Sequence, residues 1–163
     1  MKLLIISLFV LIPSLSYADV NVRSQGQKLY WEGDLLDYGA EIGLGRDFGD
    51  KENSGLLRLR VGYTIARQSI FMTAAPCIDL YNNQTANFGL HLEAMNFERG
   101  VWFAIEPFTN KHLNHGVNLS VGFSLIGYEM EVKKNNKQDL DYTHFLKLKL
   151  PVSILVWALN KDG

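Results

Sequence analysis

Apolar and polar side chains alternate with a period of two along most of this chain, and this pattern predicts β-strands with two unlike faces. The clearest run is residues 57–67, where large apolar side chains occupy one face. Arg58 and Arg60 share the other face with glycine, threonine and alanine. Four further runs repeat the scheme: residues 38–47, 87–95, 117–125 and 143–156.

Three weaker runs complete the pattern: residues 20–31, 69–81 and 100–109. We count residues 20–31 as the first strand because closure favours an even number of strands. The alternation changes phase at residues 125–126 and continues to residue 132, which we interpret as a β-bulge in a long seventh strand. Together these runs predict an all-β fold, a closed antiparallel up-and-down barrel of eight strands.

Glycines gather on the polar face of the predicted strands, where they leave room for long charged side chains in a narrow lumen. The apolar face then points outward, as in a transmembrane barrel. No apolar run after Ala18 approaches the roughly 20 residues of a membrane-spanning helix. The glycines of the polar face are Gly43, Gly45, Gly62, Gly89 and Gly122.

The first residues have the three-part layout of a secretory signal peptide. Lys2 gives a positive start, residues 3–12 are apolar, and small residues at positions 16 and 18 suit a signal peptidase. We therefore predict a signal peptide over residues 1–18 and a single barrel domain over residues 19–163. Export of this kind is Sec-type and leads to the periplasm or the outer membrane.

Charge and cysteine content narrow the classes of function. The formal net charge is −1, which gives no electrostatic reason to expect a nucleic-acid partner. Cys77 is the only cysteine, so the chain has no internal disulfide. Stability must come from packing or from a membrane.

Aromatic residues lie near the ends of the predicted strands, where a membrane barrel carries its interfacial girdles. We expect one rim to hold Tyr30, Trp31, Tyr38, Phe97, Trp102, Tyr142 and Phe145, and the other Phe48, Tyr81, Phe108 and Trp157.

In strand pattern, size and girdles, residues 19–163 resemble the small eight-stranded outer-membrane barrels of Gram-negative bacteria. The resemblance implies an outer-membrane location, contact with membrane lipid and lipopolysaccharide, and insertion by the barrel-assembly machinery. One departure is that the chain continues for six residues past Trp157, whereas such barrels typically end in an aromatic residue.

With both termini in the periplasm, the expected outer loops are residues 32–37, 68, 98–100 and 133–141. These are short, and receptors and adhesins carry their function on long outer loops. The pattern therefore argues against a role in attachment to a host.

Charged residues on the inward faces predict a lumen filled by interlocked ion pairs, because eight strands leave space only for side chains. A small porin-like pore or a proton-linked site is the alternative. His91 and Glu93 lie two apart on one face and could share a metal, but no third ligand accompanies them, so we predict no metal or cofactor. The predicted network comprises Glu41, Arg58, Arg60, His91, Glu93, Glu106, Lys147 and Lys149.

Residues 106–110 and 114–118 faintly resemble the catalytic stretch of the lipid A deacylase barrels. In that alignment Pro107 replaces the histidine and Thr109 replaces the serine. Without the histidine, a hydroxyl nucleophile has no general base. If the resemblance reflects shared ancestry, it implies a decayed site without activity, and a chance similarity is the favoured alternative.

These observations lead to the hypothesis of a non-enzymatic outer-membrane barrel with a structural, protective or surface-modifying role in the envelope. An envelope protein is a conceivable partner, and so compact a chain would also suit a phage that alters its host's surface. Two alternatives stay open: a lipid A-modifying barrel enzyme, and a soluble, lipocalin-like periplasmic barrel with its faces inverted.

Overall fold

The architecture of the chain comes from a computed structural model. It describes residues 21–25, 28–47, 52–82, 85–110, 114–134 and 140–151, and the predicted signal peptide lies outside these ranges. Within them the chain forms strands and turns, with no helix long and apolar enough to cross a membrane. The strands are β1 (Asn21–Gln25), β2 (Lys28–Asp47), β3 (Asn53–Gln68), β4 (Ile70–Tyr81), β5 (Ala86–Asn96), β6 (Val101–Asn110), β7 (His115–Phe123), β8 (Ile126–Lys134) and β9 (Leu140–Pro151).

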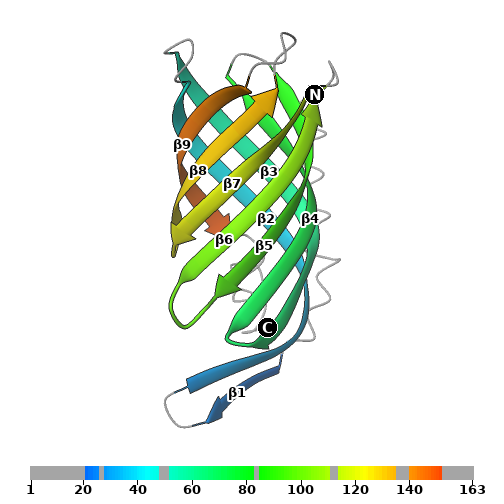
Figure 1. Cartoon of the computed structure of the whole chain (residues 1–163). Coiled ribbons are helices and arrows are strands. Elements are labelled where there is room, and N and C mark those ends of the chain that lie inside the picture. The colour runs from blue at the N-terminus through cyan, green and yellow to red at the C-terminus, as the bar shows by residue number, and fades with distance from the viewer. Residues whose placement is uncertain are drawn as a thin grey trace, which may run out of the picture.

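Strands β2 to β9 form a closed barrel of eight antiparallel strands in sequence order (Figure 1). Strand β2 pairs with its sequence neighbour β3 and also with β9, from Gly39 opposite Pro151 to Asp47 opposite Thr143. This last pairing closes the sheet and satisfies both of its edges. The predicted all-β, antiparallel, eight-stranded closed barrel is therefore confirmed.

The prediction that residues 20–31 form a wall strand is wrong. Strand β1 pairs only with the beginning of β2, from Asn21 opposite Glu32 to Gln25 opposite Lys28. This hairpin extends from one end of the barrel (Figure 1, bottom). Residues 32–37, expected to be a loop, belong to β2, where Leu35 and Asp37 are buried and Asp34 and Leu36 are more exposed.

The predicted long seventh strand is two strands, β7 and β8. They form a hairpin through Ser124 and Leu125, with Phe123 opposite Ile126, and Ser124 has a φ of 53°. A two-residue turn and a β-bulge both shift the alternation by one position, so the pattern alone does not separate them. The two errors cancel in the strand count.

The connections divide the ends of the barrel into two kinds. At the turn end, adjacent strands join through Ser69, residues 97–100 and residues 124–125, and β2 starts and β9 finishes on this side. At the loop end, the connections β2–β3, β4–β5, β6–β7 and β8–β9 have four or five residues each. The four predicted outer loops therefore do not share one end, because residues 68 and 98–100 lie at the turn end, whereas Lys134 and Leu140 pair at the loop end.

The two faces of the wall differ sharply in polarity. In β6 the inward residues alternate strictly with exposed ones, so that Glu106 is buried between exposed Ile105 and Pro107. Charged and polar side chains fill the inside, and large apolar side chains cover the outside. A soluble barrel with an apolar lumen would need the opposite arrangement.

Several aromatic residues expected at the rims lie inside the barrel instead. Trp102, Phe108 and Phe145 are all buried, because their strand positions share the parity of the inward charged residues. Tyr38 is buried as well, although it lies opposite the exposed Val61 on the outward parity of β2. Tyr142 is exposed but lies at the loop end, away from Phe97. Phe48 and Trp157 fall outside the described residues. The aromatic residues exposed on the outer wall are Tyr63, Phe88, Phe97, Phe103, Phe123, Tyr128 and Tyr142.

Inward aromatic rings pack over glycines of neighbouring strands. The Trp102 indole lies against Gly122 and Gly127, and a Cβ atom at either glycine would overlap the ring. The indole Nε1 donates to the Ser124 carbonyl oxygen at 3.0 Å, which ties the ring to the β7–β8 turn. Glycine on the inner face is thus required by the volume of its neighbours.

We predict that Gly122→Ala destabilises the barrel by about 1–3 kcal/mol, because the added methyl group and the Trp102 ring cannot occupy the same space. The measurement is urea unfolding of the purified chain, followed by tryptophan fluorescence. Gly55→Ala is the matched control, since its Cβ would meet only Asn82, at 3.7 Å. Equal stability of the two variants would contradict the packing described here.

Candidate functional site

The interior of the barrel brings together all eight residues of the predicted charge network. Each is buried, with exposed fractions between 0% and 7%. They come from five strands and meet because every inward position of a narrow barrel points at the same axis. The residues are Glu41 on β2, Arg58 and Arg60 on β3, His91 and Glu93 on β5, Glu106 on β6, and Lys147 and Lys149 on β9.

Arg58 lies at the centre of this network and contacts four carboxylates from four strands. Its Nε and Nη2 atoms donate to the two oxygens of Asp79 at 2.7 and 2.8 Å. The guanidinium also lies 2.7 Å from Glu129, 2.9 Å from Glu106 and 3.3 Å from Glu41. A planar guanidinium with five N–H donors can satisfy several acceptors at once, which a lysine cannot do with the same geometry.

Lys147 joins the same centre from the other side of the barrel. Its Nζ atom lies 2.7 Å from Glu41 and 2.6 Å from Glu129, and it donates to the Ser120 hydroxyl at 3.1 Å. The ammonium is also 5.7 Å from the centre of the Trp102 ring, within the range of a cation–π contact. The centre of the lumen is therefore packed with paired charges.

A second cluster lies beside this centre. Arg60 donates to Asp37 at 2.9 Å and to Glu41 at 2.5 Å, and Lys149 donates to Glu93. Because Glu41 binds both arginines, it links the two clusters into one network.

The buried polar residues that were not in the predicted network include Asp37, Asp79, Asn118, Ser120, Glu129 and Glu131. For most of them, the alternation of polar and apolar residues in the sequence indicates an inward-facing side chain. Glu129 and Glu131 alternate with Tyr128, Met130 and Val132, and Asp79 lies between Ile78 and Leu80. Asp37 was missed because its segment was taken for a loop.

These additions change the balance of charge inside the barrel. Seven buried carboxylates face four buried Arg and Lys side chains in the described part of the chain, so acidic side chains outnumber basic ones there. His91 contacts two of the acids, with Nδ1 3.1 Å from Glu106 and Nε2 3.2 Å from Glu93.

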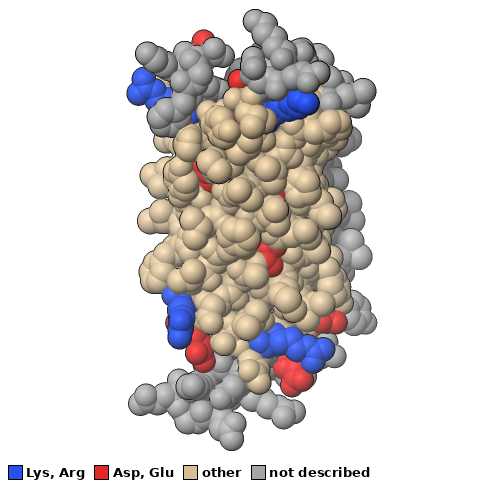
Figure 2. All heavy atoms as spheres, viewed as in Figure 1, with Lys and Arg blue, Asp and Glu red and all other residues tan. Residues whose placement is uncertain are grey.

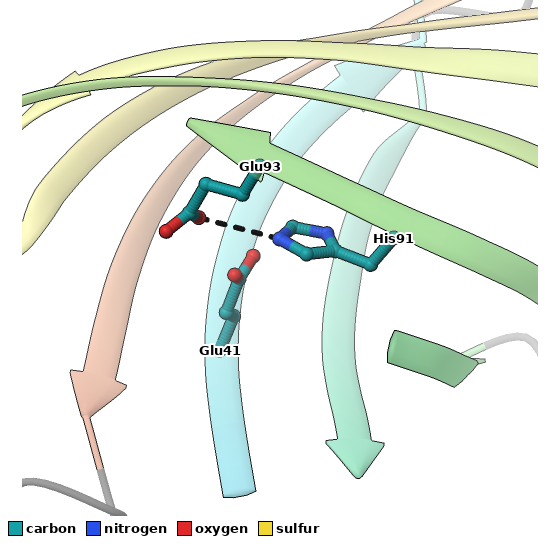
Figure 3. Close-up of side chains that lie close together, drawn as sticks. All are labelled: Glu41, His91 and Glu93. Carbon is teal, nitrogen blue, oxygen red and sulfur yellow. Dashed lines mark hydrogen bonds and ion pairs between the residues drawn. The ribbon is translucent and has the colours of Figure 1, made fainter. Parts of the chain in front are cut away.

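A possible metal site at Glu41, His91 and Glu93 is already filled by the protein's own cations. One ligand atom from each of the three residues lies within 4.8 Å of the others, and Figure 3 shows the carboxylates turned toward the imidazole ring. The third ligand comes from β2, far away in sequence. Arg60 Nη1 lies 2.5 Å from Glu41 and 3.3 Å from His91 Nε2, however, and Lys149 contacts Glu93.

A second group of potential ligands, Cys77, Asp79 and Glu106, is occupied in the same way. Arg58 binds both carboxylates of this group. Positive side chains therefore hold the positions that a metal would need, and the geometry favours structural ion pairing.

The stretch that resembles a lipid A deacylase site forms no hydrogen-bonded nucleophile. Pro107 points outward, and the buried Thr109 hydroxyl has no hydrogen-bond partner among the described residues. Activation of a hydroxyl needs a base within reach. The local geometry thus offers no support for catalysis at this position.

No family model, no curated protein and no solved structure matches this chain.

We predict that Arg58→Met destabilises the barrel by about 3–5 kcal/mol, because it leaves several carboxylates buried without their cation. Urea unfolding of the variant measures the loss. Arg67→Met serves as the control, since Arg67 is exposed and such changes usually alter stability by less than about 0.5 kcal/mol. Similar losses for both variants would contradict a central role for Arg58.

Proposed function

We propose that this chain is a non-enzymatic, transmembrane outer-membrane barrel whose role in the envelope is structural, protective or surface-modifying. The observation that carries the proposal is the outer wall, which exposes large apolar side chains from every strand of the barrel for which side chains are described. Ile42, Leu146 and Phe123, for example, are 48%, 65% and 66% exposed. Water is a poor solvent for so extensive an apolar surface, and hydrocarbon is a good one.

The distribution of charge on the outside supports the same proposal. Figure 2 shows charged side chains gathered toward the two ends of the molecule, with an almost uncharged band between them on the visible face. Such a band would match the hydrocarbon layer, and the charged ends would match the headgroups.

The lengths of six of the eight wall strands fit a bilayer as well, whereas β2 and β3 are longer, with 20 and 16 residues. Strands β4 to β9 have between 9 and 12 residues. A tilted transmembrane strand needs about 9–11 residues. The connections have one to four residues at one end and four or five at the other. In outer-membrane barrels the end with the shorter turns faces the periplasm.

The packed lumen favours a structural role over transport. Arg58, His91 and Lys147 have exposed fractions between 0% and 2%. Side chains and ion pairs thus fill the middle of the barrel, where a channel would need water. In the envelope, such a barrel would contact membrane lipid and lipopolysaccharide and would require the barrel-assembly machinery.

Gel mobility and cell fractionation test the proposal directly. We expect the mature protein to remain in washed outer membranes, to need detergent for extraction, and to migrate faster when it is not boiled. Release by osmotic shock without a heat-dependent shift in mobility would overturn the proposal.

The loss of stability caused by a charged residue on the outer wall should depend on how deep in the bilayer that residue lies. We predict that Ile42→Arg, level with the central network, destabilises the barrel in lipid by about 2–4 kcal/mol. Leu140→Arg, at the loop end of β9, should cost only about 0–1 kcal/mol. Unfolding of both variants in lipid vesicles gives the two values. If Ile42→Arg costs no more than Leu140→Arg, the apolar band does not face hydrocarbon.

A further inference from the structure

A cavity of about 390 Å³ lies at the loop end of the barrel. Its described lining comes from β3, β4, β5, β6, β8 and β9 and from residues of the adjoining connections. Amide side chains are the most frequent lining groups, and this sets the cavity apart from the ion-paired network deeper inside. The asparagines of this mouth cavity are Asn53, Asn82, Asn87, Asn110 and Asn114.

A hydrogen-bonded chain holds one wall of the mouth cavity in place. Asn87 Nδ2 donates to the Tyr81 hydroxyl at 3.2 Å, and this hydroxyl in turn donates to the buried Glu131 carboxylate. The Tyr81 ring lies 6.1 Å from the ring of Phe145, centre to centre, with 53° between their planes. Polar groups and two aromatic rings thus meet at one fixed surface.

The chemistry of the lining selects a class of ligand. An amide offers both a donor and an acceptor, which suits hydroxyl groups that also do both. Among the described residues of the lining, Lys133 is the only basic one, and it lies 3.6 Å from Glu131. Because anion sites depend on clustered positive charge, the cavity is a poor site for a phosphate. Its polar walls are equally unsuited to a fatty acyl chain.

We propose that the mouth cavity binds a small neutral saccharide of one or two sugar rings. Asparagine amides would pair with the sugar hydroxyls, and the half-buried ring of Tyr81, supported from behind by the buried Phe145 ring, would pack against the apolar face of the sugar. The volume is near the lower limit for small-molecule sites, which excludes a long glycan. Both a free sugar and the end of a lipid-attached glycan present this chemistry. The proposal does not depend on a membrane location, because one chain builds the whole cavity.

The test uses the full mature chain in lauryldimethylamine oxide, a detergent without a sugar headgroup. Glucose, galactose, N-acetylglucosamine and maltose are titrated while saturation-transfer NMR reports on bound sugar. Calcium chloride and inorganic phosphate are titrated in parallel. We expect at least one saccharide to bind and neither ion to bind.

Two cavity variants place the bound sugar. Asn87→Ala and Asn53→Ala should each weaken binding about tenfold, the effect of one lost hydrogen bond worth about 1.4 kcal/mol. Asn96→Ala at the turn end and Tyr63→Phe on the outer wall are the matched controls and should leave binding unchanged. Asn53 is exposed, so its variant remains informative if Asn87→Ala fails to fold.

To distinguish a free sugar from the end of a lipid-attached glycan, the binding of lipopolysaccharide is compared with the binding of its deacylated core oligosaccharide. Tight binding of both indicates a free or solvent-accessible glycan, and binding of only the intact molecule indicates a lipid-attached one. The proposal is overturned if no saccharide binds, if the cavity variants bind as well as the controls, or if only calcium or phosphate binds.

Discussion

The rest of the structure depends on the ion pairs of one buried arginine at the centre of the lumen. Arg58 is fully buried and contacts Asp79, Glu129, Glu106 and Glu41. A buried charge is tolerated only when partners replace its water, so the strands that carry these carboxylates must keep their register. The network thereby specifies which strands are neighbours in addition to filling the space between them.

A charged interior dictates an apolar exterior, because every wall strand has only two faces. Trp102 and the glycines beside it show how tightly the inner face is used, and little room remains for further apolar side chains there. The outer wall therefore has to bury its apolar surface outside the molecule, which is the physical basis of the proposed place in a membrane. The mouth cavity is an exception, since polar groups there surround open space instead of one another.

The alternation of polar and apolar residues correctly predicted the site residues that lie in regular strands. It did not predict the residues whose strand was assigned wrongly. Arg58, Arg60, His91 and Glu93 lie in regular runs, so their faces follow from a period of two. Asp37 was missed because the Glu32–Gly33–Asp34 segment has the composition of a turn, although β2 continues through it. Trp102 and Phe145 were placed at the rims by residue type, whereas their parity puts them inside.

The sequence by itself determined the class of fold and the inward charges, because alternation and glycine placement are local properties of each strand. Only the tertiary structure decided that β1 stands outside the wall, that residues 124–125 form a hairpin, and that Glu41 completes a group with His91 and Glu93. It also decided that Arg60 and Lys149 fill that group. These contacts join residues up to 108 positions apart, from Glu41 to Lys149, across strands that pair only when the barrel closes. These contacts cannot be predicted from the spacing of the residues along the chain.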